Sequence, residues 1–337
     1  MKKNVILPFE DHPYSQMYHH IAFPMGIIQG NAQEDITPWL CGRYINCLFD
    51  KNKLRGNAFN VYTSDLWANE DNVLIQQRIT LIPDLYDAVF GNPILHLRNM
   101  IGMGYYPSGL YNEEYIPGKW AYQKQYNQHD FLLIGYDDDS EEFISVSYLQ
   151  DGKFQRHAIP YGNMRKALTT LKTEKLQLLF LKFNAEAKFE LNLNRTVSEL
   201  SDYLRSTTST KKLSDDVIWG MDAIRRLIGF FLDSTERDSS VDIRFTRGLM
   251  EHKFYMYLRM DCLLKRSVLT DPLYVEKAQE IYKIAERVHM LGLKYNFTGN
   301  KTIASNIQNS MNEMFLTESK YLPSVLSDLQ TYKGEMT

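Results

Sequence analysis

The sequence predicts an α+β fold with an antiparallel sheet, followed by an all-helical bundle. In the first half of the chain, short apolar runs with an alternating pattern are separated by turn signals, which is typical of antiparallel strands. In the second half, apolar residues recur at spacings of three and four, which is typical of helices with one buried face. The change falls near residue 190, so we expect one domain over residues 1–190 and a helical domain over residues 191–337.

The composition excludes several classes of protein. Hydrophobic residues make up 44% of the chain and charged residues 23%, which is enough to build a sizeable globular core. The net charge is −3 and no basic stripe occurs, so we expect no nucleic-acid partner. No run approaches the roughly 20 apolar residues that a membrane helix needs. We therefore expect no membrane association either.

The cysteines and the N-terminal stretch indicate a cytoplasmic protein. Cys41, Cys47 and Cys262 are an odd set without the paired spacing of a disulfide framework, which favours a reducing compartment. The basic N-terminal stretch is followed too soon by acidic and aromatic residues to form the apolar core of a secretory signal.

A helix is expected near the start of the chain. Asp11–Ser15 resembles a helix start, with a cap residue and a proline in the first turn, and the helix should run toward Ile28. Gly26 and Gly30 indicate that it ends near there.

Short elements and one long loop should follow. Residues 39–49 and 59–62 should form a helix or turn followed by strands, and residues 72–89 a strand and then a short helix. Residues 94–98 alternate like another strand. Residues 102–126 are rich in Gly, Tyr and Pro, and a long loop of this kind in a compact domain is commonly a lid or a binding loop.

A β-hairpin is the clearest element of the first half. Residues 129–137 form an apolar run that closes on an acidic turn, and residues 143–148 alternate as its partner strand. Further strands are expected over residues 154–159 and 178–183, with a short helix over residues 164–171 between them.

Four or five helices are expected in the second half. Thr196 and Glu199 have the spacing of a capping box at the start of one helix. Apolar residues at helical spacing mark the other helices, over residues 217–231, 243–264, 271–291 and 303–329. These helices should bury their apolar faces against one another.

His129 is the first candidate for chemistry, because it opens the predicted hairpin. An imidazole at the mouth of a strand is held by rigid backbone, can reach a cleft, and titrates near neutral pH as a general base should. A hydrogen-bonded histidine at a strand end is the simpler alternative. The helix start near Ser15 adds the second part of a thiol-hydrolase arrangement, in which backbone N–H groups of an early helix hold the oxyanion.

The hairpin carries a resemblance to a known family. Residues 129–137, followed by residues 143–148, resemble the histidine strand and hairpin of the papain-like proteins. The sequence looks most like the N-terminal domain family of butirosin biosynthesis protein H, is similar to the closthioamide amide-forming enzyme, and is more distantly similar to the bacteriocin-processing peptidases. The resemblance covers about residues 5–185. It implies a papain-like fold and cysteine-dependent acyl transfer from a carrier-protein thioester to an amine.

Two positions depart from the family pattern. Where the resemblance implies the nucleophilic cysteine, this chain has Ser15, and where it implies the orienting aspartate, this chain has Ser147. Asp151 and Asp130 are alternatives to Ser147, but neither has the expected offset. Ser15 fits a non-catalytic relative, a serine variant of the enzyme, or a deliberate change of cysteine to serine. A hydroxyl is much harder to deprotonate than a thiol and needs a strong base nearby.

Cys41 is the alternative nucleophile, since its Cys-Gly pair is similar to the nucleophile motif of the bacteriocin-processing peptidases. Buried packing is the simpler explanation for an unpaired cysteine. No metal or cofactor is expected. The pair His19–His20, His12 and His96 are the histidines considered as ligands, but neighbouring histidines on a helix point in different directions, and no Cys or carboxylate completes a set at ligand spacing.

The leading hypothesis is an acyltransferase or amide-forming enzyme of natural-product biosynthesis that works through a covalent acyl-enzyme. His129 would be the base and residue 15 the nucleophile, and residues 102–126 would line the substrate cleft. The expected partners are an acyl or peptidyl carrier protein and a small amine or peptide-like substrate, and the helical domain is the candidate surface for a homodimer. The alternatives are a catalytically inactive papain-like binding or scaffold protein and a cysteine peptidase.

Overall fold

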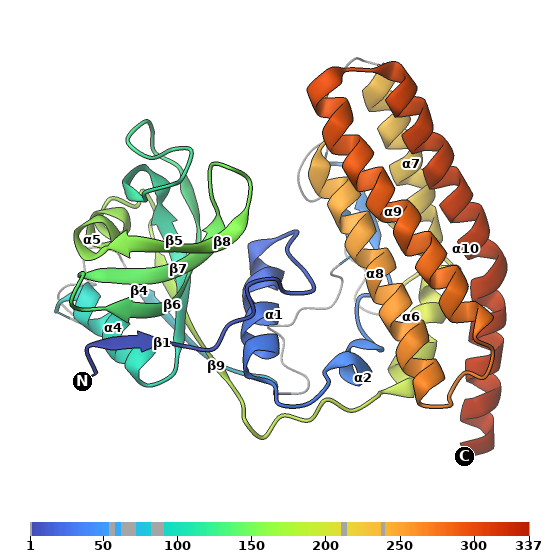
Figure 1. The fold of residues 1–337 in the computed structure, drawn as a ribbon, viewed down its shortest axis with the longest axis horizontal. Helices are drawn as coiled ribbons and strands as arrows, with labels where there is room; N and C mark the ends of the chain where they lie inside the picture. Colours follow the sequence, from blue (N-terminus) through green and yellow to red (C-terminus); the bar gives the residue numbers. More distant parts are fainter. Residues whose placement is uncertain are drawn as a thin grey trace. The chain divides into compact units, whose positions relative to one another are not determined.

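The chain divides into two compact units in the computed structural model (Figure 1). The first unit comprises Met1–Gln33 and Leu66–Ala187, and the second comprises Glu34–Asp65 and Lys188–Thr337. The structure describes residues 2–53, 58–61, 72–81, 91–209, 214–236 and 240–336. The first unit is mixed α/β with an antiparallel sheet and the second is mainly helical, as the sequence predicts.

A seven-stranded sheet forms the first unit. Its strands follow the order β4-β9-β5-β6-β7-β8, and β1 pairs with β6 beside this path. The strands are β1 (Asn4–Ile6), β4 (Leu74–Leu81), β5 (Tyr106–Asn112), β6 (Gln128–Asp137), β7 (Glu142–Tyr148), β8 (Phe154–Pro160) and β9 (Leu176–Phe183). Each of these pairs is antiparallel.

The predicted hairpin is confirmed as β6 and β7. Their register pairs Asp137 with Glu142 beside the acidic turn, and it shifts at a bulge between Leu133 and Gly135. Residues 131–136 of β6 are all buried, because the strand lies inside the sheet and both of its faces are covered. The strands predicted over residues 154–159 and 178–183 are present as β8 and β9.

Helices α4 (Pro93–Gly102) and α5 (Tyr161–Thr169) pack on the sheet of the first unit (Figure 1). Their apolar residues join those of the strands in one buried cluster. The prediction of a strand over residues 94–98 is wrong, because those residues lie in α4. The Asn92 side chain accepts a hydrogen bond from the backbone N–H of Ile94 and Pro93 occupies the first turn, so the local capping signal outweighs a short alternation.

Helix α1 (His19–Asn31) begins later and ends later than predicted. Residues 11–15 form bends before the helix rather than its first turn. Gly26 and Gly30 lie inside the helix, and the reason is close packing rather than termination. A Cβ atom on Gly30 would come within 2.6 Å of the Phe9 backbone, so the absence of a side chain lets the incoming chain cross the helix.

The segment before α1 is tied to the sheet by polar contacts. Arg156 on β8 forms a salt bridge with Asp11, with 2.5 Å between Nε and Oδ1. Tyr14 donates its backbone N–H to the side chain of Gln29 at 2.8 Å. These contacts join Asp11 to β8 and Tyr14 to the helix that follows.

The predicted loop over residues 102–126 contains regular structure. It includes β5 and the 3-10 helix η3 (Glu113–Tyr115), so it is not a long structureless loop. Strand β5 lies between β9 and β6, with Tyr111 opposite His129. The Gly, Tyr and Pro residues of this strand obscured its alternation. The helix predicted at the end of residues 72–89 and the end of residues 59–62 lie outside the described residues.

The second unit contains a small sheet and long helices. Strands β10 (Val217–Trp219), β2 (Leu48–Asp50) and β3 (Phe59–Asn60) pair in that order. The helices are α2 (Thr37–Leu40), α6 (Leu193–Leu204), α7 (Gly220–Glu236), α8 (Ile243–Lys265), α9 (Leu273–Thr298) and α10 (Lys301–Met336). Helix α9 packs against α8 and α10, and α10 also packs against α6 and α7.

Two local predictions for this half need correction. Helix α6 is capped by Asn192, whose side chain accepts from the backbone N–H of Arg195, and Thr196 lies buried inside the helix. The capping box at Thr196 and Glu199 is therefore wrong. Val217 belongs to β10 rather than to a helix, because the chain pairs with β2 before α7 begins.

Residues 34–65 group with the helical unit, although the sequence placed them in the first domain. Three side-chain contacts from α8 bind this segment. The guanidinium of Arg259 donates to the carbonyl oxygens of Cys41 and Arg43 at 2.7 and 2.6 Å, and the ring of His252 lies 2.7 Å from the carbonyl oxygen of Ile45. None of the helices in the described parts of the chain combines the length and apolar character needed to cross a membrane.

Candidate functional site

His129 lies near the start of β6, at the edge of the buried part of that strand. Its side chain is 45% exposed, whereas the strand residues that follow from Phe131 are fully buried. Tyr111 lies opposite His129 on the neighbouring strand β5. The imidazole is therefore held by a strand of the sheet and still accessible to a ligand, as a general base should be.

A buried carboxylate lies beside this histidine. Glu113 of η3 has its Oε1 3.8 Å from Nδ1 of His129, and its side chain is only 4% exposed. Asn127 donates its side-chain N–H to Oε2 of Glu113 at 2.6 Å. Lys119 pairs with Oε1 at 3.1 Å. A carboxylate fixed in this way can orient the imidazole and stabilise its protonated form.

Lys119 is itself buried, and this affects the pKa of its ammonium group. Burial lowers the pKa of Lys119, and the adjacent Glu113 carboxylate opposes that shift. Its ammonium also donates to the carbonyl oxygen of Tyr148 at 2.8 Å. The Glu113 carboxylate therefore lies beside two groups, the ammonium of Lys119 and the imidazole of His129.

His19, the first residue of α1, faces His129. The two ring centroids are 4.9 Å apart and the rings meet edge to face. His19 is 6% exposed, and neither of its ring nitrogens has a hydrogen-bond partner among the described residues. Burial lowers the pKa of His19 well below its usual value, and the nearby His129 and Lys119 lower it further, so the ring is neutral at neutral pH.

Asp130 completes a group of possible ligand atoms. One atom each from His19, His129 and Asp130 lie within 4.8 Å of one another, and the last two side chains are exposed. The ring of His19 is fixed by stacking on Phe23 and Tyr148. The sequence argument against a set of ligands with a carboxylate therefore does not hold in three dimensions.

Ser15 lies in the segment before α1 and is fully buried. It precedes the first residue of the helix by four positions, so the expectation that it occupies the first helical turn is wrong. The backbone N–H groups of the helix start are those near His19. A substrate can reach the Ser15 hydroxyl only if this segment moves.

Ser147 is fully buried on β7. It lies beside the phenol of Tyr111, whose pKa is raised mainly by burial. A serine hydroxyl cannot compensate the charge of an imidazolium as a carboxylate can. Glu113 provides that carboxylate next to His129, and it comes from a different element.

Cys41 lies in the second unit and is buried. A hydrogen bond to the side chain of Cys262, together with burial, raises the pKa of the Cys41 thiol. The same hydrogen bond lowers the pKa of Cys262 to about 7. Cys41 is therefore the protonated partner of a buried thiol pair, an environment unlike that of an activated nucleophile.

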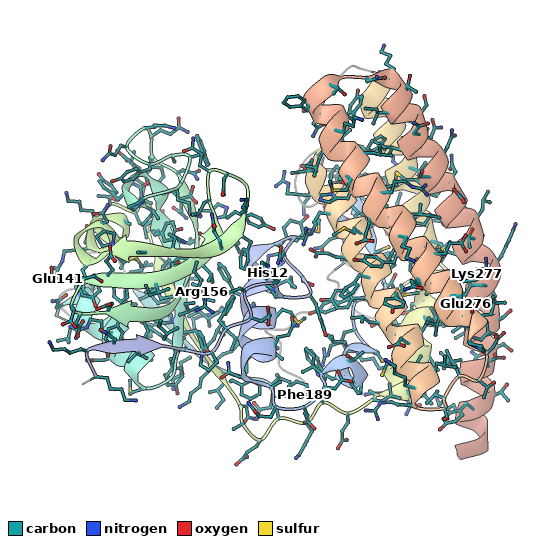
Figure 2. All side chains as sticks on the ribbon, in the orientation of Figure 1. His12, Glu141, Arg156, Phe189, Glu276 and Lys277 are labelled. Carbon is teal, nitrogen blue, oxygen red and sulfur yellow. The ribbon has the colours of Figure 1, made fainter. Side chains whose placement is uncertain are left out.

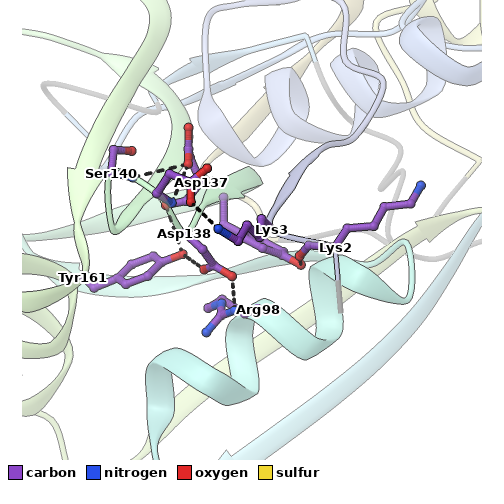
Figure 3. Close-up of polar contacts among 9 residues, drawn as sticks. Lys2, Lys3, Arg98, Asp137, Asp138, Ser140 and Tyr161 are labelled. Carbon is purple, nitrogen blue, oxygen red and sulfur yellow. Dashed lines mark hydrogen bonds and ion pairs between the residues drawn. The ribbon is translucent and has the colours of Figure 1, made fainter.

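A separate polar pocket of about 430 Å³ lies at the ends of α4 and α5. Arg98 pairs there with the carboxylate of Asp138, and the Tyr161 hydroxyl donates to the same carboxylate at 2.8 Å (Figure 3). Arg165 donates to Asn92 at 2.7 Å. These polar groups pair with one another in the wall of the pocket. None of the predicted catalytic residues is among the described residues that line the pocket.

Sequence reasoning missed Glu113 and Lys119, and it considered His19 only as a metal ligand, which it set aside. The sequence contains only a weak signal that these residues lie near His129. Glu113 lies 16 residues before His129 in what was taken for a loop, and nothing local in the sequence shows that its side chain turns back toward β6. Pairing of β5 with β6 places η3 at the histidine.

The comparisons with known proteins leave the family open. No protein-family model matches the chain, and the search of curated proteins finds no match.

Proposed function

We propose that the first unit catalyses acyl transfer with His129 as the general base. The observation that carries this proposal is the buried Glu113 carboxylate 3.8 Å from Nδ1 of an accessible His129. The helix start at His19 lies next to the same imidazole, which is the setting expected for a papain-like arrangement. We place the reaction in the cytoplasm, with a carrier-protein thioester as donor and a small amine as acceptor.

The chemistry requires two balanced steps. His129 takes the proton of the Ser15 hydroxyl as its oxygen bonds to the thioester carbon, and the C–S bond breaks to release the carrier thiol with that proton. The amine then attacks the ester carbon, the C–O bond breaks, and Ser15 regains a proton through His129. Glu113 stabilises the imidazolium in both steps, and backbone N–H groups near His19 stabilise the oxyanion.

Full burial of Ser15 favours a second candidate function. A hydroxyl that substrate cannot reach, together with buried Ser147 in place of a carboxylate, fits a binding or scaffold protein that keeps the cleft without the reaction. In that case the imidazole of His129 and the carboxylate of Asp130 would contact a peptide-like ligand.

Turnover of acyl-N-acetylcysteamine thioesters with amine acceptors tests the proposal, with thiol release and amide formation measured by mass spectrometry. We expect His129→Ala to lower the rate about 100-fold or more, since general-base catalysis contributes about that much. Glu113→Gln should lower it roughly tenfold or more. Ser15→Ala should abolish a covalent acyl adduct on the protein. His12→Ala and Glu186→Gln are matched controls, because both residues are exposed in the first unit and lie outside this contact network.

The outcomes separate the candidate functions. Turnover that survives in His129→Ala contradicts the assignment of the base. Turnover that depends on His129 but not on Ser15 means that the acyl group passes directly to the amine. Binding of an acyl peptide without turnover, weakened by His129→Ala, supports the scaffold function instead.

A further inference from the structure

We propose that His19, His129 and Asp130 form a binding site for a divalent transition-metal ion such as Zn²⁺. Two imidazoles and one carboxylate are a donor set that suits Zn²⁺ and its first-row neighbours rather than Mg²⁺ or Ca²⁺. Three protein ligands leave a further coordination position for water or for a ligand atom.

The geometry requires only small side-chain movements. The three ligand atoms lie within 4.8 Å of one another. Metal–ligand bonds of about 2.0–2.2 Å place ligand atoms roughly 3.4 Å apart in a tetrahedral site. His129 and Asp130 are exposed and can close that difference by rotation, whereas His19 is fixed by ring stacking.

The second, independent observation is the state of His19. Its ring is buried, and within the part of the chain that the structure describes both ring nitrogens lack hydrogen-bond partners. Leaving a buried polar group unsatisfied costs about 1–3 kcal/mol, so such groups usually have a partner. A metal ion provides one for the nitrogen that faces His129 and Asp130. A neutral imidazole carries no proton on one of its ring nitrogens. A metal ion binds a histidine through that unprotonated nitrogen.

The surrounding charges are compatible with a dication. Asp130 and Glu113 are carboxylates and Lys119 is the neighbouring cation, but Lys119 is already paired with Glu113 at 3.1 Å. Glu113 also lies 3.8 Å from Nδ1 of His129. With Glu113 beside Nδ1, Nε2 is left to bind a metal, and a carboxylate near the other ring nitrogen is the usual outer-shell arrangement of a ligating histidine.

This inference does not rest on the proposed acyl transfer. The two share His129, because the nitrogen lone pair that binds a metal is not available to take a proton. A metal ion at this site therefore inhibits general-base chemistry, and its binding is measured without any substrate.

Titration of the metal-stripped full-length protein tests the site. Zn²⁺ binding is followed by isothermal titration calorimetry, and Co²⁺ binding by its visible absorption, which reports the coordination number. We expect one ion per chain, with affinity lowered at least tenfold in both His19→Ala and Asp130→Asn. Glu113→Gln should weaken binding by about 10- to 100-fold, as loss of an outer-shell partner does.

His12→Ala is the matched control, because His12 is an exposed histidine of the same unit, outside the group (Figure 2). It should bind as the wild type does. Circular dichroism melting verifies that each variant is folded, and His19→Asn replaces His19→Ala if the latter is not. Absence of binding by the folded wild type overturns the proposal, and so does binding that His19 and Asp130 substitutions leave unchanged or that His12→Ala weakens equally.

Discussion

His19 and His129 carry the same side chain but have different environments. His19 is 6% exposed and surrounded by Phe23 and Tyr148, whereas His129 is 45% exposed and lies beside Glu113. Burial lowers the pKa of His19 and favours its neutral ring, whereas His129 is accessible to solvent beside a carboxylate. These opposite settings at a separation of 4.9 Å make the pair the chemically distinctive feature of the first unit.

The thiol pair of the second unit gives a prediction at the same scale. The pKa of Cys262 is lowered to about 7, chiefly by the hydrogen bond from Cys41, and the pKa of Cys41 is raised. Because only the thiolate is alkylated, iodoacetamide at pH 8 should label Cys262 before Cys41 in the folded protein. Peptide mass spectrometry measures the order. Labelling of Cys41 first contradicts this account, and the unfolded protein is the control in which all three cysteines react.

Cys41→Ala should slow the labelling of Cys262. The substitution removes the hydrogen bond that lowers the pKa of Cys262. A higher pKa means less thiolate at pH 8. An unchanged labelling rate would show that this hydrogen bond does not set the reactivity of Cys262.

At the scale of elements, the crossing of Phe9 over α1 fixes the path of the segment between β1 and α1. The crossing depends on Gly30, where a Cβ atom would meet the Phe9 backbone at 2.6 Å. We expect Gly30→Ala to lower the free energy of unfolding by about 1–3 kcal/mol, because backbone must move to admit the methyl group. Urea unfolding followed by fluorescence measures the change.

Gly162 of α5 provides the control for that substitution. A Cβ atom there meets nothing within 4 Å, so Gly162→Ala should leave stability unchanged or raise it by up to about 1 kcal/mol through better helix propensity. Equal destabilisation by the two substitutions would mean that the crossing is not the cause.

Across elements of the second unit, a buried polar cluster joins α6, α8 and α10. Lys253 and Glu318 are both fully buried and lie 2.5 Å apart, and the hydroxyl of Tyr203 donates to the same carboxylate oxygen at 2.8 Å. A charge removed from water is tolerated only when it is paired, so the three side chains fix the relative register of three helices. The sequence shows these residues only as polar interruptions in apolar helix faces.

At the scale of the whole molecule, Arg259 is one of the residues that join residues 34–65 to the second unit. This buried guanidinium donates to the carbonyl oxygens of Cys41 and Arg43, which binds residues 34–65 to α8. Burial lowers its pKa to about 10, so it is still charged at neutral pH. Arg259→Met should leave both carbonyl groups without this donor and lower the free energy of unfolding by about 3 kcal/mol.

Hydrogen exchange measured by mass spectrometry locates that effect. Backbone amides of residues 41–47 should exchange faster in Arg259→Met than in the wild type, because the contacts that hold the segment are lost. Arg287→Met is the control, since Arg287 is exposed on α9. Exchange in residues 41–47 that is equal in the two variants would show that Arg259 does not hold the segment.

The sequence by itself determined the elements whose pattern is local. The hairpin of β6 and β7, the strands β8 and β9, and the long helices α8, α9 and α10 follow from periodicity within each segment. The sequence also placed His129 at the start of its strand. The end of α1 and the nature of α4 were missed because close packing at Gly30 and the Asn92 cap outweighed the simpler patterns at those positions.

Only the tertiary structure decided which side chains meet. Glu113 and His19 reach His129 from separate elements, 16 and 110 positions earlier in the chain, and Arg259 reaches Cys41 across more than 200 positions. Such pairings depend on how strands align and helices pack, and these are properties of the whole fold rather than of any local stretch. The chemistry of the candidate site therefore depends on packing that no local sequence pattern predicts.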